Sequence, residues 1–349
     1  MAVVATPSAA SQSGARTLGA LHDLPRVSLA HLPTPVDKLQ RLGAVLGHDR
    51  LFVKRDDCTG LAFGGNKIRQ LEFYLGEAQA QNADTILITG AVQSNFVRCA
   101  AAAAVKLGMQ CHIQLEHRVA DVDATYEQSG NVLLNHLLGA TLHYYPDGEN
   151  ESGADRRVHE IAADLQQQGR QPYVIPLAPG HPPLGALGYV VAAEELLLQL
   201  DAQGMSVDEI VVPSGSGHTH GGLLFGLRAL GSSIRVVGVC VRRSKALQRP
   251  RILSRCKEIA ALLGTPEAVD ESDIVVEDRY LAPGYGHLND STLEAIKTAA
   301  RTEALMLDPV YSGKAMACLI QRARGSGAER STLMMHTGGT PAIFAYQPA

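Results

Sequence analysis

The sequence predicts an α/β protein with two lobes, in which largely parallel sheets are flanked by helices. Short apolar segments alternate with longer helical segments along most of the 349 residues, and this alternation is typical of parallel sheets. The alternation runs in two rounds, and no repeat of fixed short period is visible. A chain of this length can form two domains of ordinary size, so the two rounds favour two lobes.

The predicted elements follow a proline-rich, extended entry segment at 31–35. Short apolar runs predict strands at 51–54, 85–89, 111–115, 141–145, 173–176, 209–213, 235–241, 274–276 and 333–336. Helical patterns lie between them, ending near 82, 107 and 230 and covering 131–138, 158–168, 187–200, 252–263, 293–305 and 314–322. In parallel sheets, ligands bind beyond the carboxyl ends of the strands, so the loops there are the candidates for function.

Composition excludes several classes of protein. The chain is 46% hydrophobic and 19% charged, which suits a globular core, and its net charge of −4 argues against dedicated binding to nucleic acid or a membrane surface. No apolar run is long enough to span a bilayer. The arginine pairs 156–157 and 242–243 are expected to be solvated. Six scattered cysteines, without a Cys-x-x-Cys pair or a zinc-like neighbourhood, indicate a reducing compartment, the cytoplasm, and no metal site.

The stretch Gly64-Gly65-Asn66-Lys67 stands at the start of a predicted helix. Its glycines allow close contact between the backbone and another group. A lysine held at such a junction can act as a nucleophile toward a carbonyl cofactor. By itself, the stretch is better explained as a surface lysine at a helix start.

The loop from Ser214 to Thr219 follows a predicted strand and opens a helix. Its glycines let successive N–H groups converge, and the helix N-terminus favours an anion. The loop matches neither a Walker A sequence nor a dinucleotide-binding fingerprint, and it is interpreted as a cup for one phosphate rather than an ordinary turn.

Two other strand ends are ambiguous from the residues alone. Gln93-Ser94-Asn95 suits a carboxylate but equally suits a plain helix N-cap. In the segment 336–339, Thr337 is suited to a ring nitrogen, although a simple turn explains it as well. Tyr285 and Tyr311 lie in glycine-containing segments and are either functional or structural.

Seven motifs occur in an order that closely resembles one family. They are Gly-Gly-Asn-Lys at 64–67, Gln-Ser-Asn at 93–95, Gly-Ala-Leu-Gly-Tyr at 185–189, the loop at 214–219, Pro-Gly-Tyr-Gly at 283–286, Asp-Pro-Val-Tyr-Ser-Gly-Lys at 308–314 and His-Thr-Gly-Gly at 336–339. The resemblance is to the D-cysteine desulfhydrase and 1-aminocyclopropane-1-carboxylate (ACC) deaminase family, and it covers roughly residues 25 to 346.

The resemblance implies pyridoxal 5′-phosphate as cofactor and a tryptophan-synthase-β-like fold (fold type II). It implies that Lys67 holds the cofactor as a Schiff base, and that Asn95 and Thr337 face the cofactor ring. The residues that it assigns to the phosphate are Ser214, Gly215, Ser216, Gly217, His218 and Thr219. The substrate-side residues that it implies are Ser94, Asn95, Phe96, Tyr285, Tyr311 and Ser312, with Lys67, Ser94, Tyr285 and Tyr311 as the catalytic set.

The resemblance also implies domain boundaries and a homodimer. Residues 25–68 and 205–349 are expected to form the large cofactor-binding domain, and residues 69–204 the small domain. Residues 1–24 are expected to be a disordered extension, with a weak organelle-targeting peptide as the alternative.

The reaction that the resemblance implies is an α,β-elimination on a small sulfur amino acid. Ser312 and Thr337 favour this branch, because ring-opening deaminases carry Glu and Leu at these positions. D-Cysteine, giving pyruvate, ammonia and hydrogen sulfide, is the preferred substrate, and L-cysteate sulfo-lyase, deaminase and racemase activities are the alternatives. Phe96 and His218 depart from the family pattern, and they motivate a further alternative, a non-catalytic ligand binder.

Overall fold

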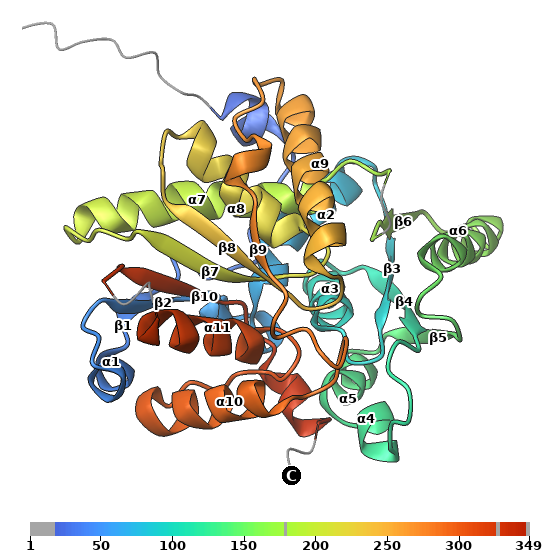
Figure 1. The fold of residues 1–349 in the computed structure, drawn as a ribbon. Coiled ribbons are helices and arrows are strands. Elements are labelled where there is room, and N and C mark those ends of the chain that lie inside the picture. Colours follow the sequence, from blue (N-terminus) through green and yellow to red (C-terminus); the bar gives the residue numbers. More distant parts are fainter. Residues whose placement is uncertain (1–17, 178–179, 326–328, 347–349) are drawn as a thin grey trace, which may run out of the picture.

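The computed structural model describes residues 18–177, 180–325 and 329–346, and these fold into the predicted two-lobed α/β architecture (Figure 1). The large sheet has the strand order β1 (Val36–Lys38), β2 (Leu51–Arg55), β10 (Thr332–His336), β7 (Glu209–Ser214), β8 (Arg235–Cys240) and β9 (Val275–Glu277). The small sheet has the order β5 (Thr141–Tyr145), β4 (Gln110–Glu116), β3 (Thr85–Ala91) and β6 (Pro172–Ile175). All neighbouring strands are parallel except β1 and β2.

The large sheet is buried on both faces. Successive side chains of a strand point to opposite faces, and Ile210 and Val212 of β7 accordingly join one apolar cluster while Val211 joins another. The first cluster includes side chains of α7 (Leu184–Ala202), α8 (His218–Ala229) and α9 (Lys245–Leu263). The second includes α1 (Gln40–Leu46), α10 (Asp290–Glu303) and α11 (Ser312–Arg324). Figure 1 shows these two sets of helices on opposite sides of the sheet.

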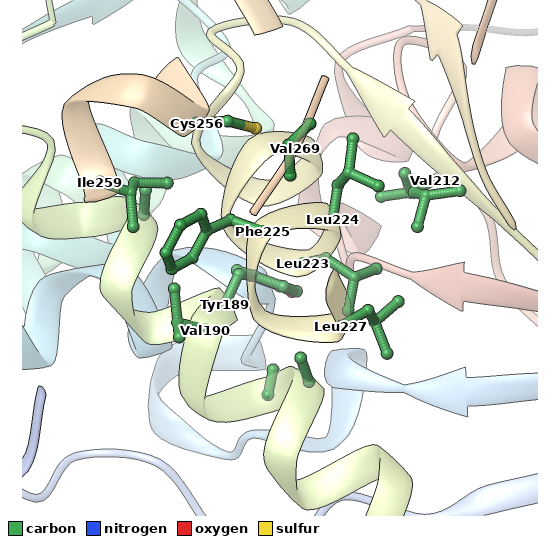
Figure 2. Packing of buried hydrophobic residues seen from close by; sticks show 14 of the residues in the cluster. Tyr189, Val190, Val212, Leu223, Leu224, Phe225, Leu227, Cys256, Ile259 and Val269 are labelled. Atoms are coloured by element: carbon green, nitrogen blue, oxygen red, sulfur yellow. The ribbon is translucent and has the colours of Figure 1, made fainter. Parts of the chain in front are cut away.

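Small residues let α7 and α8 pack closely. A Cβ atom at Gly222 would lie 2.2 Å from the carbonyl oxygen of Ala186, and one at Gly226 would lie 2.7 Å from the Cβ of Ala193. Around this contact, larger side chains complete the core, and Figure 2 shows Phe225 of α8 next to Val190 of α7. The close packing places the N-terminus of α8 firmly at the end of β7.

The small sheet is covered by helices on both faces. On one face, β3 and β4 pack against α2 (Asn66–Ala80) and α3 (Asn95–Lys106). On the other, Leu87 and Val174 pack against α6 (Glu151–Gln167). The short helices α4 (Ala124–Gln128) and α5 (Gly130–Leu137) complete this lobe.

Helix α2 joins the two lobes. Its Phe73 belongs to the core of the large lobe, whereas the next residue, Tyr74, belongs to the core of the small lobe. The same helix carries a fully buried arginine, Arg69, which contacts Asp56 at 3.0 Å and Glu195 of α7 at 2.9 Å. Glu195 also pairs with buried Lys54 of β2 at 2.5 Å, so two cations and two carboxylates form one buried network.

Two expected boundaries differ from the structure. Residues 19–23 form a 3-10 turn, in which Leu21 is 1% exposed within the core of the large lobe. Residues 18–24 are therefore anchored by apolar packing, and the remainder of the predicted extension lies outside the described residues. Helix α7 was assigned to the small domain, but its apolar side chains pack with α8 in the large lobe.

The arginine network predicts a large effect of a single substitution on stability. Arg69→Met leaves the buried carboxylate of Asp56 without its guanidinium partner, so we expect the free energy of unfolding to fall by about 3–5 kcal/mol. Urea denaturation followed by circular dichroism measures this change. The control is Arg157→Gln, which removes an exposed ion pair and should change stability by about 0.5 kcal/mol or less. Equal stability of the two variants would contradict the prediction.

Candidate active site

The principal pocket lies where the loops after β3, β7, β8 and β10 converge, and it encloses about 930 Å³ including its open mouth. Both lobes contribute to it, as expected for a ligand site beyond the carboxyl ends of parallel strands. The sequence-predicted residues that line it are Lys67, Ser94, Asn95, Phe96, Gly215, Ser216, Gly217, Thr219, Tyr285, Tyr311 and Thr337.

The glycine segment before Lys67 makes a close backbone contact with the end of β10. Gly64 and Gly65 have φ values of 62° and 117°, which favour glycine. A Cβ at Gly338 would lie 2.7 Å from the Cα of Gly65, so neither segment leaves room for a side chain there. The backbone N–H of Asn66 donates to the carbonyl oxygen of Thr337 at 3.1 Å. These contacts fix the first turn of α2 and with it the position of Lys67.

Lys67 lines the pocket, and no acidic side chain in the described part of the chain pairs with its amine. Its Nζ lies 3.4 Å from the Oε1 of Gln70 and 5.2 Å from the ring centroid of Phe96. Because desolvation disfavours the charged form, the pKa of Lys67 falls to about 8. About a tenth of the amine is therefore unprotonated at pH 7, far more than for an ordinary lysine, and the unprotonated amine is the form that acts as a nucleophile.

Burial lowers the pKa of two other lysines, but neither lines the pocket. Lys54 is held by Glu195, and Lys314, whose pKa falls to about 8, donates to the carbonyl oxygens of Leu281 and Gly284. These hydrogen bonds to protein groups indicate that Lys54 and Lys314 have structural roles. Among these three lysines, Lys67 is distinguished by its position in the pocket and not by its lowered pKa.

The predicted phosphate cup is formed by four of its six residues. Gly217 has a φ of 98° and is the N-cap of α8, so the free N–H groups of this helix begin at the pocket wall. The hydroxyl oxygen of Thr219 accepts hydrogen bonds from the side-chain amides of Asn66 at 2.8 Å and Gln70 at 2.9 Å. Its own proton is then free to be donated to an anion.

The other two residues of the predicted cup lie behind the pocket wall. The hydroxyl of Ser214 is bonded to His220 at 3.0 Å and accepts from Gln248 at 2.9 Å. The side chain of His218 is buried 6.5 Å from the ring of Tyr74, and burial holds its pKa well below the ordinary value, so the ring is neutral.

The turn at Ser94 and Asn95 forms a helix N-cap, which is one of the two alternatives that the sequence left open, and it also lies at the pocket. The hydroxyl of Ser94 accepts from the backbone N–H of Phe96 at 3.2 Å, which makes it the N-cap of α3. Both Ser94 and Asn95 also line the pocket. Asn131 orients the side chain of Asn95 by donating to its Oδ1 at 2.9 Å.

Tyr285 and Tyr311 meet in the pocket, with their hydroxyl oxygens 2.8 Å apart. Burial, followed by the proximity of Tyr285, raises the pKa of Tyr311 well above its ordinary value, so its hydroxyl stays protonated. Ser312, by contrast, does not line the pocket: its hydroxyl donates to the Oδ1 of Asp308 at 2.5 Å.

Sequence reasoning missed a group of arginines. Arg242 and Arg243 were expected to be solvated, but their side chains are 10% and 17% exposed and line the pocket, whereas Arg156 and Arg157 are exposed as expected. Arg118 and Arg251 line it as well. The available signal was position, because Arg242 and Arg243 directly follow the end of β8, where parallel sheets place ligands.

The donor set fits a cofactor that joins an aldehyde to a phosphate. One pocket brings together the amine of Lys67, with its lowered pKa, the backbone of Gly215–Gly217 at the N-terminus of α8, and the hydroxyl residues Thr219 and Thr337. Residues 27–338 match the family model described as pyridoxal-phosphate dependent enzyme, and the chain belongs to this family.

Similar proteins narrow the assignment within the family. D-Cysteine desulfhydrases of Salmonella choleraesuis (strain SC-B67) and Salmonella typhi are 41% and 40% identical over 333 residues, which cover 94% of this chain and 99% of each relative. A crystal structure of an ACC deaminase homologue matches with a TM-score of 0.82 and 37% identity, covering 93% of this chain and 95% of that one. O-Ureido-L-serine synthase, with a TM-score of 0.63 and 19% identity over 93% of both chains, shares the fold. The resemblance stated from the sequence is thereby confirmed.

The lowered pKa of Lys67 predicts how cofactor capture depends on pH. In cofactor-free protein, the rate at which pyridoxal 5′-phosphate is captured on Lys67 should rise as the amine deprotonates and level off above a midpoint near pH 8. Borohydride trapping at timed intervals, followed by peptide mass spectrometry, measures this rate. Exposed Lys257 is the internal control for reaction at a surface amine. A midpoint near 10 for Lys67, or trapping on another residue, would contradict the assignment.

Proposed function

We propose that the protein is a carbon–sulfur lyase that converts D-cysteine and water to pyruvate, ammonia and hydrogen sulfide. The observation that carries this proposal is the amine of Lys67, held near neutral pKa beside an oxyanion cup and two tyrosine hydroxyls. The identity of about 41% to D-cysteine desulfhydrases over nearly the whole chain supports the choice of substrate.

In the proposed reaction, the bound cofactor supplies an electron sink for the pair released from the Cα–H bond. The pair then expels the β-sulfur, which leaves with a proton as hydrogen sulfide. Addition of water to the remaining three-carbon fragment releases ammonia and pyruvate, so the atoms balance.

We assign Lys67 as the base that takes the Cα proton. The pKa of its free amine, about 8, would let Lys67 accept and return a proton near neutral pH. No acidic side chain among the described residues pairs with Lys67, which supports this role, because a carboxylate would hold the amine protonated. The ring of Phe96 lies 5.2 Å from the amine and contributes to its burial.

We assign the substrate carboxylate to the Ser94–Asn95 turn, where the N-terminus of α3 meets the pocket. Tyr285 and Tyr311 are assigned to the leaving sulfur. Two hydroxyls 2.8 Å apart share one of their two protons, which leaves the other for donation to the sulfur. The raised pKa of Tyr311 supports a donor role, since the group is protonated throughout the neutral range.

A substrate panel tests the proposal. D- and L-cysteine, L-cysteate, D-serine, β-chloro-D-alanine and ACC are assayed for keto acid, ammonia, and sulfide or sulfite. We expect D-cysteine to have the highest kcat/KM among the sulfur amino acids, with equal yields of pyruvate and sulfide.

The matched control for the panel is Lys67→Ala, which should lower kcat by about 10³-fold or more because nucleophile and base are lost together. Spectral changes without ammonia release would indicate a non-catalytic binder, racemised product a racemase, and sulfite from L-cysteate a sulfo-lyase. Each of these results would replace the proposal.

We propose further that the protein is a cytoplasmic homodimer. All six cysteines are free, and none of the described helices is long and apolar enough to cross a membrane, which is compatible with a reducing compartment. One chain has a mass of 37.1 kDa, and light scattering after size-exclusion chromatography should give twice this value. Cell fractionation tests the location. A mass of one chain would contradict the dimer.

A further inference from the structure

Four arginines line the pocket and come from both lobes. Arg118 follows β4 of the small lobe, Arg242 and Arg243 follow β8 of the large lobe, and Arg251 lies in α9. Their side chains are between 8% and 17% exposed, so water solvates them poorly. Arg251 reaches toward the phosphate cup, where its Nε donates to the carbonyl oxygen of Ser216 at 3.1 Å.

Glu151, the first residue of α6, lies among these arginines. It contacts Arg242 at 2.9 Å and Arg251 at 3.8 Å, and it also pairs with Arg243. Burial acts to raise the pKa of Glu151, but the three arginines outweigh it and hold the pKa below its ordinary value, so the group is a carboxylate. Arg242 also donates to the carbonyl oxygen of Gly148 at 3.0 Å, so the contact joins the two lobes.

The positive charge of this cluster exceeds the negative charge that faces it. Glu116 pairs with Arg118 at 2.7 Å, and Glu149, which is 75% exposed, lies 3.4 Å from Arg242. Glu151 is thus the partly buried anion shared by the other three arginines. Burial, followed by repulsion from Arg243, lowers the pKa of Arg251 to about 10, a sign that its charge is incompletely compensated.

We propose that these arginines form a second oxyanion-binding site, separate from the phosphate cup. The carboxylate of Glu151 occupies the position in this site that a free oxyanion would take. The ligand class is a small oxyanion: sulfate, phosphate or the carboxylate of an amino acid entering the pocket. Guanidinium groups bind such planar or tetrahedral oxyanions through charge-assisted hydrogen bonds. Exchange of Glu151 for a free anion would also release the contact between residues 148–151 and 242–251, and so loosen the lobes at the pocket mouth.

The test is isothermal titration of the holoenzyme with sodium sulfate, against sodium chloride at matched ionic strength. Glu151→Gln removes the internal competitor, and we expect sulfate to bind at least about tenfold tighter than to the wild type. The double variant Glu151→Gln with Arg243→Gln should lose that gain, because Arg243 has Glu151 as its ion-pair partner. Glu160→Gln, an exposed acid on the same helix, is the matched control and should bind sulfate as the wild type does.

Several results would overturn the proposal. They are equal sulfate affinity in wild type and Glu151→Gln, a gain that persists without Arg243, an equal gain in Glu160→Gln, or the same heat from chloride. Sulfate binding that appears only in cofactor-free protein would assign the ion to the phosphate cup and also overturn the proposal.

Two further arms keep the test decisive. Acetate in place of sulfate distinguishes a carboxylate ligand from a divalent oxyanion, and tighter binding of either supports an oxyanion site. If Glu151→Gln does not fold, wild type is compared with Arg243→Gln, and unchanged sulfate binding overturns the proposal. No arm measures turnover, so the proposed lyase reaction can fail while this site stands, and the reverse also holds.

Discussion

The pocket depends on the backbone contact between the glycine segment before α2 and the end of β10. No side chain fits between Gly65 and Gly338, and the N–H of Asn66 is bonded to the carbonyl oxygen of Thr337. This contact places an amine from one segment and a hydroxyl from another at fixed positions in the same cavity. Arg69 lies two residues after Lys67 in α2, and its buried ion pairs with Asp56 and Glu195 hold this helix in place. The position of Lys67 is therefore fixed as well.

Hydrogen bonds then connect the lysine segment to the phosphate cup. Asn66 and Gln70, on either side of Lys67, both donate to the hydroxyl of Thr219 in the first turn of α8. The close packing of α8 on α7 determines where that turn lies. A substitution that shifted one helix would therefore disturb the lysine and the cup together. Motifs that are far apart in the sequence are thus connected by direct hydrogen bonds.

Desolvation controls the chemistry of the site more than specific charge pairs do. Burial is the largest cause of the lowered pKa of Lys67 and of the raised pKa of Tyr311, so it brings the amine closer to neutrality and keeps the phenol protonated. The arginine cluster has the opposite character, because four positive charges are concentrated around Glu151 and Glu116. The pocket thus combines a desolvated amine with a region of positive charge.

The sequence by itself determined the fold class and the centre of the site. Alternating apolar runs and helical patterns are local properties, so the two parallel sheets were predictable, and the ordered motifs led to Lys67, Thr337 and most of the Gly215–Thr219 loop. Tertiary structure alone decided which polar side chains face the cavity. Ser214 and Ser312 turn to buried partners, and Arg242 and Arg243 turn inward to Glu151. Glu151 is 91 positions from Arg242, and a linear pattern of residue types does not encode such a contact. The partners of Ser312 and Ser214 include residues four and six positions away, but the direction in which each side chain points depends on how its loop packs.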